Sequence, residues 1–196
     1  MYDKLNITEN HLQALCLFTN GFDRGCYIRE VAKLLKMSPR TAQLILDSLE
    51  NKGILESKTK GKIREYSLKR NSISRNYISL VEQYKTIAFL EKNLLIKEII
   101  EKITPFINGI GIVFGSYAKG TADKDSDLDI FVAGEYDKEE IKRVSKTYAV
   151  EINIKCYPLK TFVNNLANDV LLKEVLKNHI VFLNSELFIG EVLKNG

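Results

Sequence analysis

The chain has 196 residues, of which 45% are hydrophobic and 28% charged, and its formal net charge is +4. This composition predicts a soluble globular protein with one large domain or two small ones, and the net charge alone is too small to indicate a nucleic-acid partner. No apolar run approaches the roughly 20 residues of a membrane span, and the N-terminal residues lack the apolar segment of a secretory signal.

The three cysteines, Cys16, Cys26 and Cys156, are scattered and form no CxxC pair. An odd, dispersed set argues against a disulfide framework or a zinc site. Free thiols are usual in a reducing compartment, so we expect a cytoplasmic protein.

The first fifty residues predict three helices. Apolar residues recur at three- and four-residue spacing over residues 8–20, 26–36 and 39–52. Ser38 is a favourable N-cap for the third helix, and Pro39 suits its first turn. Gly53 follows its last turn, where glycine commonly ends a helix.

Two strands, 54–58 and 63–68, flank a turn at residues 59–62, which predicts a hairpin. Three helices followed by a hairpin resemble the winged helix-turn-helix domain, here over residues 1–70. The resemblance implies that the third helix reads DNA and that the hairpin is the wing. The expected DNA contacts comprise base-reading residues on the helix and phosphate-binding residues on the wing: Arg40, Thr41, Gln43, Lys58, Lys60, Lys62 and Arg64. Winged helices also serve as dimerisation or protein-docking modules, and that alternative stays open.

Residues 72–103 have a continuous helical pattern, with a bend expected near Lys92 and Asn93. We interpret residues 71–104 as a helical linker, with a domain boundary near Thr104. The helix has more apolar positions than one face needs, which predicts packing against a second copy and a homodimer. The alternative is that it packs only against the C-terminal half.

The most informative stretch is 115–132. An apolar strand over residues 110–114 leads into Gly115 and Ser116, and a glycine there lets the backbone approach a ligand closely. After a short loop, Asp127 and Asp129 alternate with apolar residues, so they share one face of a strand. Two adjacent carboxylates repel each other, and a bound cation relieves that repulsion.

Three better-known motifs do not fit this stretch. Gly115 and Gly120 have the spacing of a P-loop, but Thr121 stands where its lysine is required. The run from Asp123 lacks the glycine and the final glutamate of an EF-hand. Ser116 lacks a nearby histidine in sequence to act as the base of a hydrolase.

Further along, the pattern predicts a helix over 138–147, a strand over 148–157, a helix over 161–178 and a short strand over 180–183. Glu151 lies in the predicted strand 148–157, where a carboxylate is unusual. An ordinary solvent-facing glutamate on an edge strand is the alternative.

Gly115-Ser116, Ala118, Gly120 and the run 126–129 resemble the signature of minimal nucleotidyltransferases in the polymerase-beta-like superfamily. The resemblance covers about residues 110–193, and Lys119 stands where that group often has arginine. It implies an α+β protein whose small nucleotidyltransferase domain, residues 105–196, has a mixed sheet flanked by helices.

The resemblance also implies a nucleoside triphosphate substrate, with ATP expected, and two Mg²⁺ ions as cofactors. The implied metal-binding and catalytic residues are Asp127, Asp129 and Glu151. The implied phosphate-binding residues are Gly115, Ser116 and Lys119. We expect Asp123 and Asp125 to face solvent.

A different class of function stays open. In this alternative, the chain is a DNA-binding regulator or an antitoxin-like protein whose nucleotidyltransferase domain senses a nucleotide or docks a partner. Minimal nucleotidyltransferases resemble antitoxin components that act on HEPN-type toxins, so a HEPN-type protein is a candidate partner. The acceptor of the transferred nucleotide is not indicated by the sequence.

Overall fold

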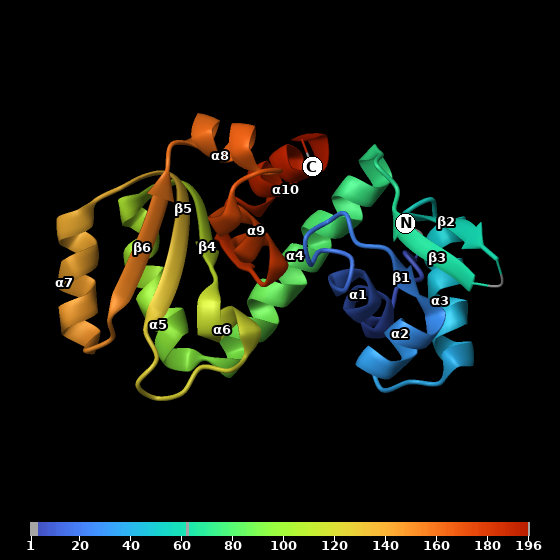
Figure 1. Cartoon of the computed structure of the whole chain (residues 1–196). Coiled ribbons are helices and arrows are strands. Elements are labelled where there is room, and N and C mark those ends of the chain that lie inside the picture. The colour runs from blue at the N-terminus through green and yellow to red at the C-terminus, as the bar shows by residue number, and fades with distance from the viewer. Residues whose placement is uncertain (1–3, 62, 196) are drawn as a thin grey trace. The chain divides into compact units, whose positions relative to one another are not determined.

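A computed structural model describes residues 4–61 and 63–195 of the chain. The chain divides into two compact units, Met1–Val81 and Glu82–Gly196, and the division falls inside the long helix α4, Ser72–Lys92 (Figure 1). The second unit therefore includes α5, Leu94–Ile103, which the sequence placed in a linker. Within the described part of the chain, no helix combines the length and apolarity that crossing a membrane requires.

The first unit contains three helices and a three-stranded antiparallel sheet. The helices are α1 (Glu9–Cys16), α2 (Ile28–Leu34) and α3 (Pro39–Asn51). The strands β1 (Cys26–Tyr27), β2 (Leu55–Lys60) and β3 (Ile63–Leu68) lie in the order β1-β3-β2. Three predicted helices and the predicted hairpin are thus present, and β1 is an additional strand.

Two details of this unit follow from local chemistry. The Ser38 hydroxyl accepts a hydrogen bond from the Thr41 backbone N–H at 3.0 Å, which confirms it as the N-cap of α3. The prediction that a helix starts at Cys26 is wrong, because Cys26 pairs with Tyr66 of β3 and helix α2 begins at Ile28.

Helix α4 ends at Lys92, and α5 begins at Leu94, which confirms the predicted bend. The Asn93 side chain donates to the Phe89 carbonyl at 2.8 Å. Large apolar side chains stay exposed along α4 at seven-residue spacing: Ile73 is 41%, Leu80 38% and Ile87 58% exposed. Because residues seven apart lie on the same side of a helix, these three form one exposed apolar row, which we call the α4 stripe.

The second unit is built on a four-stranded sheet in the order β6-β5-β4-β7. Its strands are β4 (Ile107–Val113), β5 (Leu128–Tyr136), β6 (Ile152–Tyr157) and β7 (Ile180–Leu183). Strand β5 is parallel to β6 and antiparallel to β4, and β4 is antiparallel to β7. The sheet is therefore mixed and flanked by helices, as predicted.

The remaining elements of this unit are short. They are the 3₁₀ turn Thr104–Phe106 and the helices α6 (Gly115–Lys119), α7 (Lys138–Tyr148), α8 (Leu159–Asn165), α9 (Val170–Lys177) and α10 (Ser185–Asn195).

The middle of strand β5, residues 130–133, is buried on both faces of the sheet. Leu128, Ile130 and Val132 join a core with apolar residues of α5 and α7. On the opposite face, the Phe131 ring lies 5.9 Å from that of Phe162 on α8. Because side chains alternate along a strand, Asp129 shares the α8 side of the sheet with Phe131.

The structure corrects three sequence-based boundaries. The predicted strand 148–157 begins only at Ile152, because α7 continues to Tyr148 and ends with Ala149 in the left-handed conformation. The predicted helix 161–178 is two helices, since Asp169 caps α9 by accepting from the Leu172 N–H at 2.9 Å. Helix α10 follows β7 and was not predicted. Within the described residues, Cys16, Cys26 and Cys156 form no disulfide.

Candidate functional site

A tight corner joins β4 to the strand that carries the paired aspartates. The Phe114 N–H donates to the Asp129 carbonyl at 3.0 Å, which holds the corner against β5. Gly115 begins α6 with a φ of +68°, and a Cβ atom there would lie 2.1 Å from Oδ2 of Asp129. Both the backbone conformation and the approach of the carboxylate therefore require glycine at this position.

Asp127 and Asp129 form a carboxylate pair at the start of β5. Asn153 of β6 donates to Oδ2 of Asp127 at 3.2 Å. The pKa of Asp129 is raised, first by partial burial and then by the charges of Asp127 and Glu174, while Lys119 and Lys155 oppose the change. The geometry thus concentrates negative charge beside the Gly115 corner.

Lys119 and Glu174 lie at the edge of this charged region. The Lys119 ammonium, at the end of α6, is 3.4 Å from Oε1 of Glu174 on α9. Both side chains are largely exposed, so the ion pair contributes little to stability. The pair matters because of where it lies: the charge of Glu174 raises the pKa of Asp129, and the charge of Lys119 lowers it.

Glu151 lies just outside β6. Its carbonyl accepts the Leu128 N–H at 2.8 Å, and the pairing of Leu128 with Ile152 puts Glu151 alongside Asp127 in the strand register. Its side chain is exposed. Among residues 4–61 and 63–195, no three His, Cys, Asp or Glu side chains are grouped so as to hold a metal ion.

The donor set nevertheless suits a hard divalent cation. The neighbouring carboxylates of Asp127, which directly precedes β5, and Asp129 supply the oxygen ligands that Mg²⁺ prefers, and their mutual repulsion falls when a cation binds. We conclude that the residues present fit a magnesium ion.

The loop between α6 and β5 has an internal structure. Asp123 accepts hydrogen bonds from the Ser126 hydroxyl at 2.9 Å and from the Asp125 N–H at 3.1 Å. Ser116 lies in the first turn of α6, and its carbonyl accepts the Thr121 N–H at 3.0 Å. Asp123 and Asp125 are exposed, as expected, and Asp123 organises the loop.

Two residues near the pair were missed by the sequence reading. Asn153 lies on the same predicted strand face as Glu151, so the alternation pattern contained a signal for it. Glu174 carried no local signal, because it comes from a helix that only the tertiary fold brings to Asp129.

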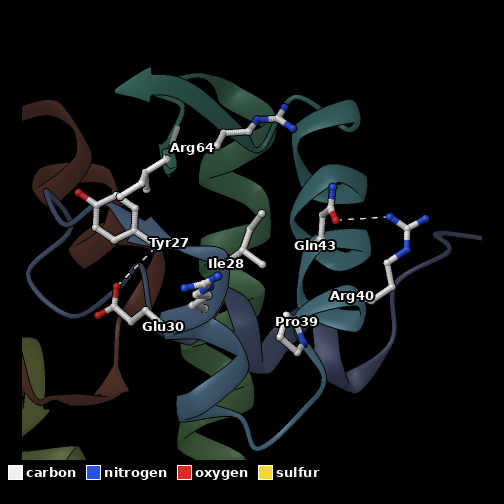
Figure 2. Close-up of a pocket in the computed structure, with 9 residues that line it drawn as sticks. Tyr27, Ile28, Glu30, Pro39, Arg40, Gln43 and Arg64 are labelled. Atoms are coloured by element: carbon white, nitrogen blue, oxygen red, sulfur yellow. Dashed lines mark hydrogen bonds between the residues drawn. The ribbon is translucent and has the colours of Figure 1, made fainter. Parts of the chain in front are cut away.

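The first unit contains a separate groove, a cavity of about 780 Å³ between the starts of α2, α3 and β3. Figure 2 shows Tyr27 and Glu30 on one side and Arg40 and Gln43 on the other. Arg40 Nη1 donates to Oε1 of Gln43 at 3.4 Å. Arg29 also lines the groove and was not identified from the sequence.

The other predicted DNA-contact residues have different environments. The Thr41 and Ser38 hydroxyls are 2.8 Å apart at the helix cap, and Lys58 is exposed on β2. Lys62 lies outside the described residues, as does the side chain of Lys60.

Arg64 is held inside its own unit. It donates to Asp47 at 2.9 Å and to the Ser57 hydroxyl at 2.8 Å, and it pairs with Glu50. Two carboxylates of the same unit therefore neutralise Arg64, in place of the DNA phosphate that we expected from the sequence.

Comparisons with known proteins agree with the geometry of the second unit. Residues 95–183 match the family model described as "Nucleotidyltransferase domain". This match supports a nucleotidyltransferase. A search of curated proteins found no match.

Two solved structures are similar to parts of the chain. One is described as "Crystal structure of the toxin-antitoxin with AMP-PNP": it is 21% identical, the match covers 57% of this chain and 83% of that one, and the TM-score is 0.31. The other is TrmBL2, an archaeal chromatin protein with "a novel mode of DNA binding": it is 14% identical over 88% of this chain and 71% of that one, with a TM-score of 0.30. Both TM-scores are too low to establish a shared overall fold.

Replacing Gly115 by alanine should destabilise the protein more than replacing Gly120. Both residues have φ near +70°, which costs alanine about 1–2 kcal/mol, but only Gly115 faces a carboxylate, whereas nothing lies within 4 Å of a Cβ at Gly120. We expect Gly115→Ala to lower the free energy of unfolding by a further ~1–3 kcal/mol in urea titrations. The additional loss of stability in Gly115→Ala should be smaller in an Asp129→Ala background. If Gly115→Ala and Gly120→Ala lower the free energy of unfolding equally, the close contact of Gly115 with Asp129 is contradicted.

Proposed function

We propose that the second unit transfers a nucleoside monophosphate from a nucleoside triphosphate, with ATP as the expected donor, to an acceptor hydroxyl. The observation that carries the proposal is the Asp127–Asp129 pair packed against the Gly115 corner. In this reaction an acceptor oxygen attacks the α phosphorus, the bond to the bridging oxygen of the β phosphate breaks, and pyrophosphate leaves.

The chain's own groups have distinct roles in this proposal. Asp127 and Asp129 hold Mg²⁺, and Glu151, beside Asp127 in the register, completes the ligand set toward the acceptor and helps to take its proton. When bound, the metal stabilises the charge on the attacking and leaving oxygens. Asn153 orients the Asp127 carboxylate through its hydrogen bond.

The phosphates of the donor lie on the α6 side of the pair. The Ser116 hydroxyl and the backbone amides at Gly115 and Ser116 donate to phosphate oxygens. Lys119 supplies a positive charge there when it turns from Glu174 toward the triphosphate.

We further propose that the first unit is a winged helix-turn-helix that binds double-stranded DNA. The order α1-β1-α2-α3-β2-β3 and the sheet β1-β3-β2 support this assignment. Arg40, Thr41 and Gln43 are at the exposed start of α3, where a recognition helix contacts base edges. Wing lysines Lys58, Lys60 and Lys62 contact phosphates, whereas Arg64 supports the wing from inside.

A homodimer accompanies this DNA-binding proposal. The α4 stripe repeats every seven residues and is apolar and exposed, which supports a seam between two copies of α4. Two copies present two recognition helices, as paired half-sites in DNA require.

The second candidate function is a DNA-binding regulator or antitoxin-like protein whose second unit senses a nucleotide or docks a HEPN-type protein. The exposed side chain of Glu151 favours it, whereas the groove lined by Arg29 and Arg40 in the first unit is common to both candidates. The two candidates differ in whether the nucleotide is consumed.

Asp129→Asn should abolish pyrophosphate release from ATP with Mg²⁺, because the amide cannot bind the cation as the carboxylate does. Glu151→Gln should lower the rate by about 10²–10⁴-fold if Glu151 takes the acceptor proton. Asp125→Asn is the matched control, since Asp125 is exposed in the neighbouring loop. Full-rate release by Asp129→Asn excludes this mechanism, and tight ATP binding without release in the wild type favours the sensor.

Replacing Arg40 and Gln43 together by alanine should weaken specific DNA binding, because each base contact is worth about 1–3 kcal/mol. Lys58→Ala should weaken binding to all sequences alike and reduce the salt slope by about one. Binding is measured by mobility shift at several salt concentrations, with Lys102→Ala in the second unit as the control. Unchanged affinity for every sequence would remove the DNA assignment.

Ile87→Glu should convert a dimer into a monomer, because it places a charge in the apolar α4 stripe. The molar mass is measured by light scattering across a concentration series. Arg75→Glu, an exposed position of α4 outside the stripe, should leave the mass unchanged. A monomeric wild type at high concentration rules out this dimer.

A further inference from the structure

A second cavity, of about 390 Å³, lies within the second unit next to α6. One wall is the end of α4, and the other is α6 with the loop that follows. The lining residues are Tyr84, Lys85, Ala88, Phe89, Lys92, Asn93, Tyr117, Ala118, Lys119, Gly120, Ala122 and Ile180. We call it the α4–α6 cavity. Its volume is within the range of small-molecule sites.

The α4–α6 cavity combines positive charge with aromatic surface. Three of its lining residues are lysines and three are aromatic, and no acidic residue is among the described residues that line it. Lys85 and Lys119 already pair with Glu82 and Glu174, which lie outside the lining, whereas Lys92 is exposed at the rim. Positive charge at this rim favours an anion, and flat aromatic rings favour a planar ring system. A nucleoside phosphate has both features.

A buried ionic cluster holds one of these lysines in place. Lys85 donates to the two carboxylate oxygens of Glu82 at 2.9 and 3.0 Å, and its ammonium is 3.0 Å from Nε2 of His179. The side chains of Glu82 and His179 are fully buried, and that of Lys85 is 13% exposed. The Lys85 ammonium is therefore committed to the buried carboxylate, and Lys85 is a fixed part of the cavity wall.

The protonation states of the cluster follow from its contacts. Burial opposes ionisation of Glu82, but the charges of Lys85 and His179 and their hydrogen bonds together lower its pKa to about 2. Burial and the charge of Lys85 lower the pKa of His179, against the opposing influence of Glu82. Nδ1 of His179 is 2.9 Å from the Leu176 carbonyl, and Nε2 is 3.2 Å from Oε1 of Glu82 as well as 3.0 Å from the Lys85 ammonium.

The cavity adjoins the aspartate pair through α6. Gly115 begins this helix against Asp129, and Lys119 ends it at the cavity wall. Five residues of α-helix span only about 7 Å. A ligand in the cavity is therefore within one short helix of the proposed reaction centre.

We propose that the α4–α6 cavity binds a nucleoside phosphate, with Lys92 and Lys119 facing its phosphates and Tyr84 and Tyr117 facing its base. The inference rests on the proposed function for the choice of a nucleotide as ligand. Its phosphates either belong to the donor triphosphate at the aspartate pair or to a second nucleotide.

The test measures ATP binding by calorimetry in EDTA. Without a divalent cation the aspartate pair repels a triphosphate, so the remaining affinity reports the cavity. Ala88→Trp should block the cavity, and Lys92→Glu should reverse a charge at its exposed rim; each should weaken binding at least about tenfold. Lys102→Glu makes the same charge change on α5 outside the lining and should have no effect. Lys85 is not mutated, because its removal would deprive the buried Glu82 carboxylate of its ion-pair partner.

The outcomes separate this proposal from the catalytic one. No ATP binding in EDTA, or equal binding by Ala88→Trp, Lys92→Glu and Lys102→Glu, overturns it. If pyrophosphate binds as tightly as ATP, the assignment of Tyr84 and Tyr117 to the base is overturned. Asp127→Asn should not lower the EDTA affinity even where it abolishes transfer, so the cavity can be tested whether or not the catalytic proposal holds.

With Mg²⁺ added, the stoichiometry identifies the source of the phosphates. One ATP per chain, with both cavity variants impaired, supports a part of the donor site. Two ATP per chain, with only one lost in those variants, supports a second nucleotide site.

Discussion

The second unit depends on one close approach, that of the Asp129 carboxylate to the backbone of Gly115. No side chain fits between them, so the corner after β4 closes directly onto β5. The Phe114 N–H bond to the Asp129 carbonyl fixes the same corner from the backbone side. This contact sets where α6 begins, and therefore which groups face the carboxylates. The proposed phosphate contacts of Ser116 depend on the direction in which α6 leaves this corner.

Charge is distributed differently on the two sides of α6. On one side, Asp127 and Asp129 crowd together, and neighbouring cations only partly offset them. On the other side, the α4–α6 cavity is lined by lysines. Lys119 belongs to both environments, since it pairs with Glu174 and also lines the cavity. A polyanion with bound cations is the kind of ligand that satisfies both sides, because its phosphates meet lysines and its metal meets carboxylates.

Local patterns predicted the parts of the site that lie close together in sequence. Alternation along β5 placed Asp127 and Asp129 on one face, and the helix and strand order of the first unit followed from spacing and turn residues. The predicted ends of helices and strands were wrong where one or two residues decide whether the element continues. Ala149 adopts a left-handed conformation that ends α7, so Glu151 precedes β6 instead of lying within it. Asp169 caps α9 and divides a region whose apolar spacing favours one helix.

By itself, the sequence determined the alternation that sets Asp127 and Asp129 two residues apart and the glycine corner before them, because alternation and turn chemistry act over a few neighbouring residues. The mixed sheet was implied by the resemblance of residues 110–193 to a known family. Only the tertiary structure decided that Glu174 reaches Asp129, that Arg64 is neutralised within its own unit, and that Glu82 and His179 enclose Lys85. These partners are separated by between three and 97 residues along the chain. Electrostatic interactions depend on distance in space, and no local pattern encodes which distant elements the packing of a core brings together.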